Sequence, residues 1–149
     1  MGEFMKVIDV RKERGIVDPP GAEPTPVPPP ERLLEVGAAN QTRLSGRPVA
    51  GPLFDFAPQV DGYLKAHLFG AIFARDNVSW MDRELATLGG LSMLPGAEPQ
   101  LGSHMRISRN VGLDEAQLMQ VVSVLRERVS EDSASRAETA RLATLPTTA

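Results

Sequence analysis

An apolar repeat with helical spacing begins at residue 60 and constrains the fold of this chain more than any other feature. Apolar or aromatic side chains recur three or four residues apart, which is the spacing that lines one face of an α-helix. The stripe contains Val60, Tyr63, Leu64, His67, Leu68, Ala71 and Ile72, and Phe69 and Phe73 add a second stripe. A helix that is apolar on two sides is expected to be buried, either within the domain or at a contact between subunits.

Three further helices are predicted downstream, and each has recognisable end signals. Ser79 is a typical N-cap residue for the first of them. The second ends near Gly112, a residue type that commonly follows the last helical turn. Asp114 and Gln117 form a capping-box pair at the start of the third. The three helices are expected over about residues 80–93, 97–110 and 114–130. The chain is therefore predicted to be all-α.

The N-terminal region lacks this helical pattern. We interpret residues 1–4, "MGEF", as an expression scar. Residues 5–30 are predicted to be extended, because a β-branched run at residues 7–10 is followed by seven of the thirteen prolines of the chain, and proline disfavours helices and central strands. For the proline-rich part, residues 18–30, a linker is favoured over a ligand for a partner protein.

Residues 31–130 are predicted to form the helical domain. Its first part, residues 31–45, indicates a modest helix interrupted at Gly37. A loop rich in apolar side chains follows, and it is expected to pack against the domain or a partner subunit. Residues 131–149 are mostly small and polar, so they are predicted to be a weakly helical tail with a frayed end beyond Pro146.

The composition excludes several kinds of site. The chain has no cysteine, which removes disulfides, thiolate nucleophiles and cysteine-ligated metals. Its two histidines fall short of the roughly three protein ligands of a typical catalytic zinc, so no metal site is predicted. A net charge of −3 gives no basic surface for nucleic acid. With no apolar stretch of about 20 residues and no visible signal peptide, a cytoplasmic protein without membrane contact is expected.

Glu84 and His104 are titratable residues that helical spacing turns towards the core. Glu84 follows Trp80 by one turn on an apolar helix face, and His104 shares an inward-facing side of its helix with Gln100 and Leu101. Apolar surroundings disfavour the charged form of a carboxyl group. Taken alone, each residue is more simply explained by a structural role, as a carboxylate paired with an arginine or as a core histidine. His67 is also expected to be a core residue on this ground.

The motifs "HLFG", "RELATL" and "NVGLDEAQL", with the spacing between Glu84 and His104, lie within residues 54–129. In these motifs the chain resembles the carboxymuconolactone decarboxylase family, which shares its fold with the AhpD-like alkylhydroperoxidases. The resemblance implies an AhpD-like helical bundle assembled as a trimer or hexamer. In the peroxidase branch, a helix with Cys-x-x-Cys-x-x-x-His follows a helix that bears a glutamate. His104 and Glu84 match this histidine and glutamate, but Ala97 and Gln100 stand at the cysteine positions, so thiol peroxidase activity is not expected.

The decarboxylase branch implies a cofactor-independent enzyme that decarboxylates or isomerises a small carboxylated lactone or a related cyclic acid by acid–base chemistry. His104 would stabilise the oxyanion or donate the proton, and Glu84 would orient the imidazole or act as the acid. His67 would complete the pocket. The expected substrate-binding residues are Trp80, Gln100 and Arg106. The alternative is a non-catalytic helical module for oligomerisation or binding, which the missing cysteines and the long proline-rich segment favour.

Overall fold

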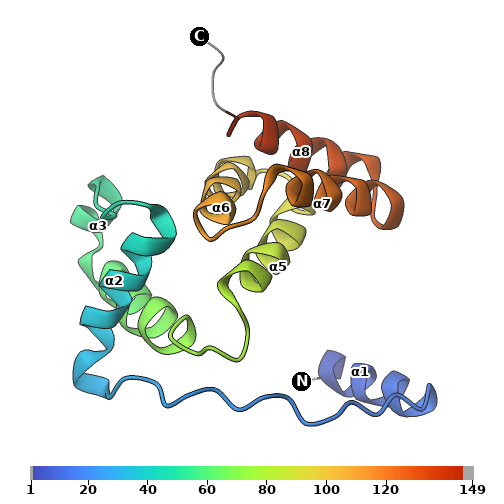
Figure 1. Cartoon of the computed structure of the whole chain (residues 1–149), viewed down its shortest axis with the longest axis horizontal. Helices are drawn as coiled ribbons and strands as arrows, with labels where there is room; N and C mark the ends of the chain where they lie inside the picture. Colours follow the sequence, from blue (N-terminus) through green and yellow to red (C-terminus); the bar gives the residue numbers. More distant parts are fainter. Residues whose placement is uncertain (1, 146–149) are drawn as a thin grey trace.

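The computed structural model describes residues 2–145, and the regular structure within this range is helical throughout, as predicted (Figure 1). Segments without regular structure connect the helices. The elements are α1 (Gly2–Glu13), η1 (Pro30–Arg32), α2 (Leu33–Ser45), α3 (Pro52–Phe56), α4 (Pro58–Tyr63), η2 (Leu64–Ile72), α5 (Trp80–Ser92), α6 (Glu98–Asn110), α7 (Glu115–Arg128) and α8 (Glu131–Leu142).

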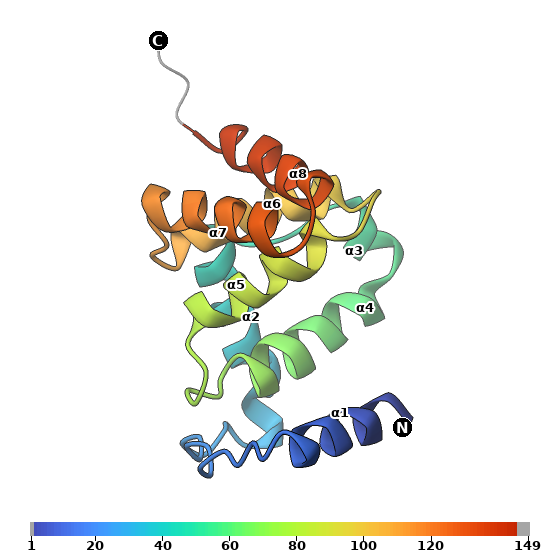
Figure 2. The same ribbon diagram turned by 90° about the vertical axis from the view of Figure 1, so that its right-hand side faces the viewer.

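Two groups of packed helices make up the body of the molecule. α2 packs along η2, and helices α5 to α8 pack on one another around the main core. Contacts between α2 and α6 join the two groups, and Figures 1 and 2 show them side by side in both views. The main core consists of Leu88, Leu101, Met105, Leu113, Leu118, Val122, Leu125, Ala134, Ala137 and Ala140.

Glycines set the close approach of α2 and η2. A Cβ atom added to Gly37 would overlap the carbonyl oxygen of Lys65, and one added to Gly70 would overlap that of Leu33. Both glycines are buried. The prediction that Gly37 interrupts this helix is wrong, because α2 runs unbroken through it. Its missing side chain instead allows two helix backbones to touch.

The outward face of α4 and η2 differs from the prediction. η2 is a π-helical segment that continues α4, so the predicted helix exists. However, Tyr63 is 75% exposed, so of the two predicted environments only a contact between subunits is left for it. His67, which was expected to be a core residue, is exposed. The physical reason is the contact at Gly70, which turns that side of η2 towards α2 and leaves Tyr63 and His67 in solvent.

The predicted helix ends in the second half of the chain are confirmed. The Ser79 hydroxyl accepts a hydrogen bond from the Asp82 amide at 3.1 Å. Asp114 accepts from the Gln117 amide at 2.8 Å, while the Gln117 side chain accepts from the Asp114 amide at 2.9 Å. These bonds satisfy amide groups that the first turn of a helix leaves without partners.

Both ends of the chain are more helical than expected. Residues 2–13 form α1, so that residues 5–13 are helical where an extended segment was predicted, and no residue of α1 is buried. The region expected to be a weak tail contains α8, whose Ala134 and Ala137 are fully buried in the main core. Small side chains allow close helix packing, so a polar and alanine-rich sequence can still form part of a core. The predicted frayed end, residues 146–149, lies outside the described residues.

Candidate functional site

Glu84 on α5 and His104 on α6 lie in direct contact. His104 Nδ1 is 2.7 Å from Glu84 Oε2. The Glu84 side chain is 1% exposed, whereas that of His104 is 32% exposed. With Glu84 ionised, the Nδ1–H group of His104 donates to the carboxylate. The pair thus joins a buried acid to an imidazole that reaches the surface.

The local sequence explains why these two side chains meet. Leu88, one helical turn after Glu84, anchors that face of α5 in the main core. Leu101 and Met105 on α6 are also fully buried, and they fix the side of α6 from which His104 projects. Because α5 and α6 pack together, the two polar residues come into reach of each other at the edge of the core.

The contact fixes the imidazole at one nitrogen and leaves the other available. Within residues 2–145, His104 makes no hydrogen bond other than the one to Glu84. When Nδ1–H donates to the carboxylate, Nε2 carries a lone pair if the imidazole is neutral. If the imidazole is charged, Nε2 carries a proton. Such an arrangement can accept a proton and return it, with the carboxylate orienting the ring and stabilising its charged form.

The other predicted site residues do not gather around this pair. His67 is exposed on η2 and has no hydrogen bond to Glu84 or His104. Gln100 is exposed on the first turns of α6, so the expectation that it faces inward with His104 is wrong. The physical reason is the rotation of α6 about its axis, which is set by Leu101 and Met105 in the core. Trp80 lies at the start of α5, one turn before Glu84.

Arg106, two residues after His104 on α6, is also exposed, and it lines a cavity. This cavity has a volume of about 820 Å³ and is lined by Ser103 and by three arginines, Arg47, Arg106 and Arg109. Arg109 also pairs with Glu115 at 2.5 Å. None of the lining residues is acidic. The side chains of Glu84 and His104 line neither this cavity nor the one around Trp80 that is described next.

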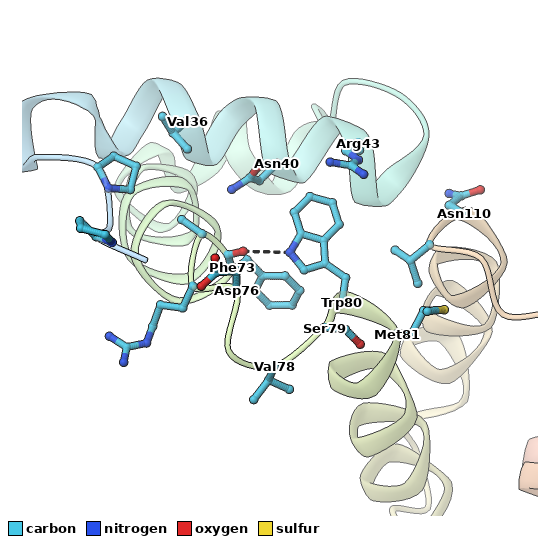
Figure 3. Close-up of a pocket in the computed structure, with 15 residues that line it drawn as sticks. Val36, Asn40, Arg43, Phe73, Asp76, Val78, Ser79, Trp80, Met81 and Asn110 are labelled. Carbon is cyan, nitrogen blue, oxygen red and sulfur yellow. Dashed lines mark hydrogen bonds between the residues drawn. The ribbon is translucent and has the colours of Figure 1, made fainter. Parts of the chain in front are cut away.

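Trp80 belongs to a second cavity, of about 610 Å³ (Figure 3). Its indole Nε1–H donates to the Phe73 carbonyl at 2.8 Å, and the Arg43 guanidinium carbon lies 4.7 Å from the centre of the indole ring. Asp76 also lines this cavity, and the backbone N–H of Thr25 donates to its Oδ1 at 2.8 Å. That hydrogen bond holds the pKa of the Asp76 carboxyl below its usual value.

Sequence reasoning overlooked Arg43 and the proline-rich segment as parts of a site. Arg43 lies on α2 and Trp80 on α5, and no local pattern links residues so far apart. The only available signal was the single tryptophan of the chain, because an indole at the start of a helix commonly packs against a residue from another element.

Within residues 2–145, no three His, Asp or Glu side chains lie close enough together to hold a metal ion. No helix of the described part of the chain has both the length and the apolar character needed to cross a membrane. In comparisons with known proteins, no family model matches this chain, and no curated protein gives a match.

Proposed function

We propose that the chain is a cofactor-independent acid–base enzyme in which Glu84 and His104 are the catalytic pair, acting on a small carboxylated lactone or a related cyclic acid. The observation that carries this proposal is the 2.7 Å contact between a buried carboxylate and a partly exposed imidazole. The resemblance to the carboxymuconolactone decarboxylase family supplies the reaction type. We assign no step of the chemistry to His67, since its side chain is exposed and has no hydrogen bond to the pair.

The proposed reaction needs one proton donor and one place for negative charge. When the bond between the carboxylate carbon and the ring carbon breaks, CO2 leaves and the electron pair moves into the conjugated lactone carbonyl. The ring carbon then takes a proton, and the Nε2–H of His104 is the donor. Before that transfer the second N–H of the imidazolium, at Nδ1, donates to Glu84 Oε2 at 2.7 Å, so that Glu84 holds the ring in place.

The arginine-lined cavity supports a carboxylated substrate. Ser103 and Arg106 line it, and they stand before and after His104 in the sequence. Arg47 adds a further guanidinium group. The planar fork of arginine binds a carboxylate through two parallel hydrogen bonds. A substrate carboxylate held there would lie along the part of α6 that carries Ser103 and Arg106.

Assembly as a homo-oligomer, a trimer or hexamer, is part of the same proposal. Large apolar side chains remain exposed on α3, where Leu53 is 62% exposed and Phe56 is 89% exposed. Apolar surface of this kind commonly marks a contact with another protein. Light scattering at micromolar concentration tests this part, and a monomer under those conditions contradicts it.

One observation favours the alternative, a non-catalytic oligomerisation or binding module. Glu84 and His104 bond directly to each other and line neither of the two largest cavities. A hydrogen bond between a buried carboxyl group and a histidine also occurs as a purely structural contact. The enzyme would lose turnover when the imidazole is removed, whereas the module would have no turnover to lose.

The deciding experiment follows CO2 release from a panel of carboxylated butenolides. The proteins compared are the wild type, Glu84→Gln, His104→Ala and, as a matched surface control on α7, Arg128→Gln. We expect turnover by the wild type and the control, and a loss of about 10²–10⁴-fold for His104→Ala, the range typical of a removed general acid. Near-wild-type rates in both site variants would contradict the catalytic role. A folded wild type that releases no CO2 from any lactone would support the module.

A further inference from the structure

We infer that the cavity around Trp80 and Arg43 is a binding site for a small aromatic carboxylate, separate from the Glu84–His104 pair. Its volume of about 610 Å³ falls in the range of small-molecule sites, roughly 300–1,000 Å³. The site goes beyond the proposed function, because neither Glu84 nor His104 lines it. Three features of the cavity carry the inference: a fixed aromatic wall, an arginine without an acidic partner, and a strap of prolines.

The aromatic wall is formed by Phe73 and Trp80. Their rings meet edge to face, with centroids 6.2 Å apart, and the hydrogen bond from Trp80 Nε1 to the Phe73 carbonyl holds the indole in place. Figure 3 shows the indole projecting from the start of α5 towards α2. Fixed aromatic rings offer a planar ligand a large apolar contact area with little loss of side-chain freedom.

Arg43 supplies the positive charge. Its guanidinium lies over the Trp80 ring, and within the described residues it forms no ion pair with a carboxylate. A guanidinium stacked on an aromatic face keeps its N–H groups free at the edge of the plane. Those N–H groups can hold a ligand carboxylate while the ligand ring contacts the aromatic wall.

The acidic residue of the cavity does not cancel this charge. Asp76 is a carboxylate whose Oδ1 accepts a hydrogen bond from the backbone N–H of Thr25, and Arg75 next to it also lines the cavity. The lining therefore contains two arginines and one aspartate, which leaves it with a net positive charge. A carboxylate ligand is favoured over a cation for this reason.

Prolines of the N-terminal segment close one side of the cavity. Pro26 and Pro28 line it, and the bond between Thr25 and Asp76 ties this segment to the end of the η2 region. Proline-rich chains are stiff and need no hydrogen bonds of their own. The segment that the sequence indicates as a linker thus forms a wall of the site.

The single tryptophan of the chain provides the measurement. In a ¹H–¹⁵N correlation spectrum, Trp80 gives the only indole signal, and it reports directly on this cavity. The probes are sodium benzoate, its uncharged analogue benzamide, and acetate, which lacks the ring. We expect benzoate to shift the indole signal saturably at millimolar concentrations. Benzamide and acetate should each bind at least about tenfold more weakly, because each lacks one half of the recognised chemistry.

Variants separate this site from the proposed active site. Arg43→Gln should weaken benzoate binding about tenfold, Arg43→Lys should have an intermediate effect, and Arg128→Gln should have none. The dispersed amide spectrum shows in each case that the variant is folded. Glu84→Gln should bind benzoate as the wild type does, whether or not it has lost turnover. The inference is overturned if benzoate leaves the indole signal unmoved, if benzamide binds equally well, if Arg43→Gln binds normally, or if Glu84→Gln abolishes binding.

Discussion

Replacing His104 with alanine tests how much the free energy of unfolding depends on the hydrogen bond between His104 and the buried Glu84 carboxylate. The substitution removes the hydrogen-bond partner of Glu84 and leaves a side chain that is 1% exposed without compensation. Breaking a fully buried ion pair in this way costs about 3–5 kcal/mol. Because His104 is itself 32% exposed, its removal admits water to the carboxylate, and we expect a smaller loss than this range, about 2–3 kcal/mol.

A second substitution shows whether charge is the cause. In the double variant Glu84→Gln/His104→Ala no charge is left to bury, so about 1 kcal/mol of the lost stability should return. Glu84→Gln alone should cost about 1 kcal/mol, because the amide can still bond the imidazole. As a control, Gln100→Ala changes an exposed residue of the same helix and should stay within about 0.5 kcal/mol of the wild type.

The assay is urea unfolding at neutral pH, followed by far-ultraviolet circular dichroism. Equal slopes across the variants would show that the free energies of unfolding are comparable. The reasoning is refuted if His104→Ala is as stable as the control, or if the double variant is less stable than His104→Ala. Either result would mean that Glu84 carries no buried charge that depends on His104.

Three further changes test the packing. Within residues 2–145, Ser108 Oγ is buried without a hydrogen-bond partner, so Ser108→Ala should raise the free energy of unfolding by about 1 kcal/mol. Ser92→Ala, which loses a 2.6 Å bond to the Leu88 carbonyl, should not raise it, and a destabilised Ser108→Ala would count against this reasoning. Gly70→Ala should lower the free energy of unfolding by about 3 kcal/mol or more, because the added methyl group forces α2 away from η2. Gly90→Ala has open space at its Cβ position and should raise it by about 0.5–1 kcal/mol. Thermal unfolding compares the two variants. Deleting residues 2–13 should leave the urea midpoint unchanged, since no residue of α1 is buried, and a marked drop would show that α1 packs on the body of the molecule.

Local sequence signals determined where two helices begin, α5, which carries Glu84, and α7. Caps at Ser79 and Asp114 act within one helical turn, so residue types at short spacing are enough to place the ends of α5 and α7. Apolar spacing likewise indicated that Glu84 faces the core, because the period of a helix fixes which residues share a face.

Only the tertiary structure decided which side chains meet. The exposure of His67 and Gln100, the burial of α8 and the cavity shared by Arg43 and Trp80 depend on how far each helix is rotated and shifted against its neighbour. Those rotations result from packing across the whole core, such as the close backbone contact at Gly37 and Gly70. Spacing along one helix contains no information about its rotation relative to another, because the core reaches a single arrangement only when all the helices fill space together.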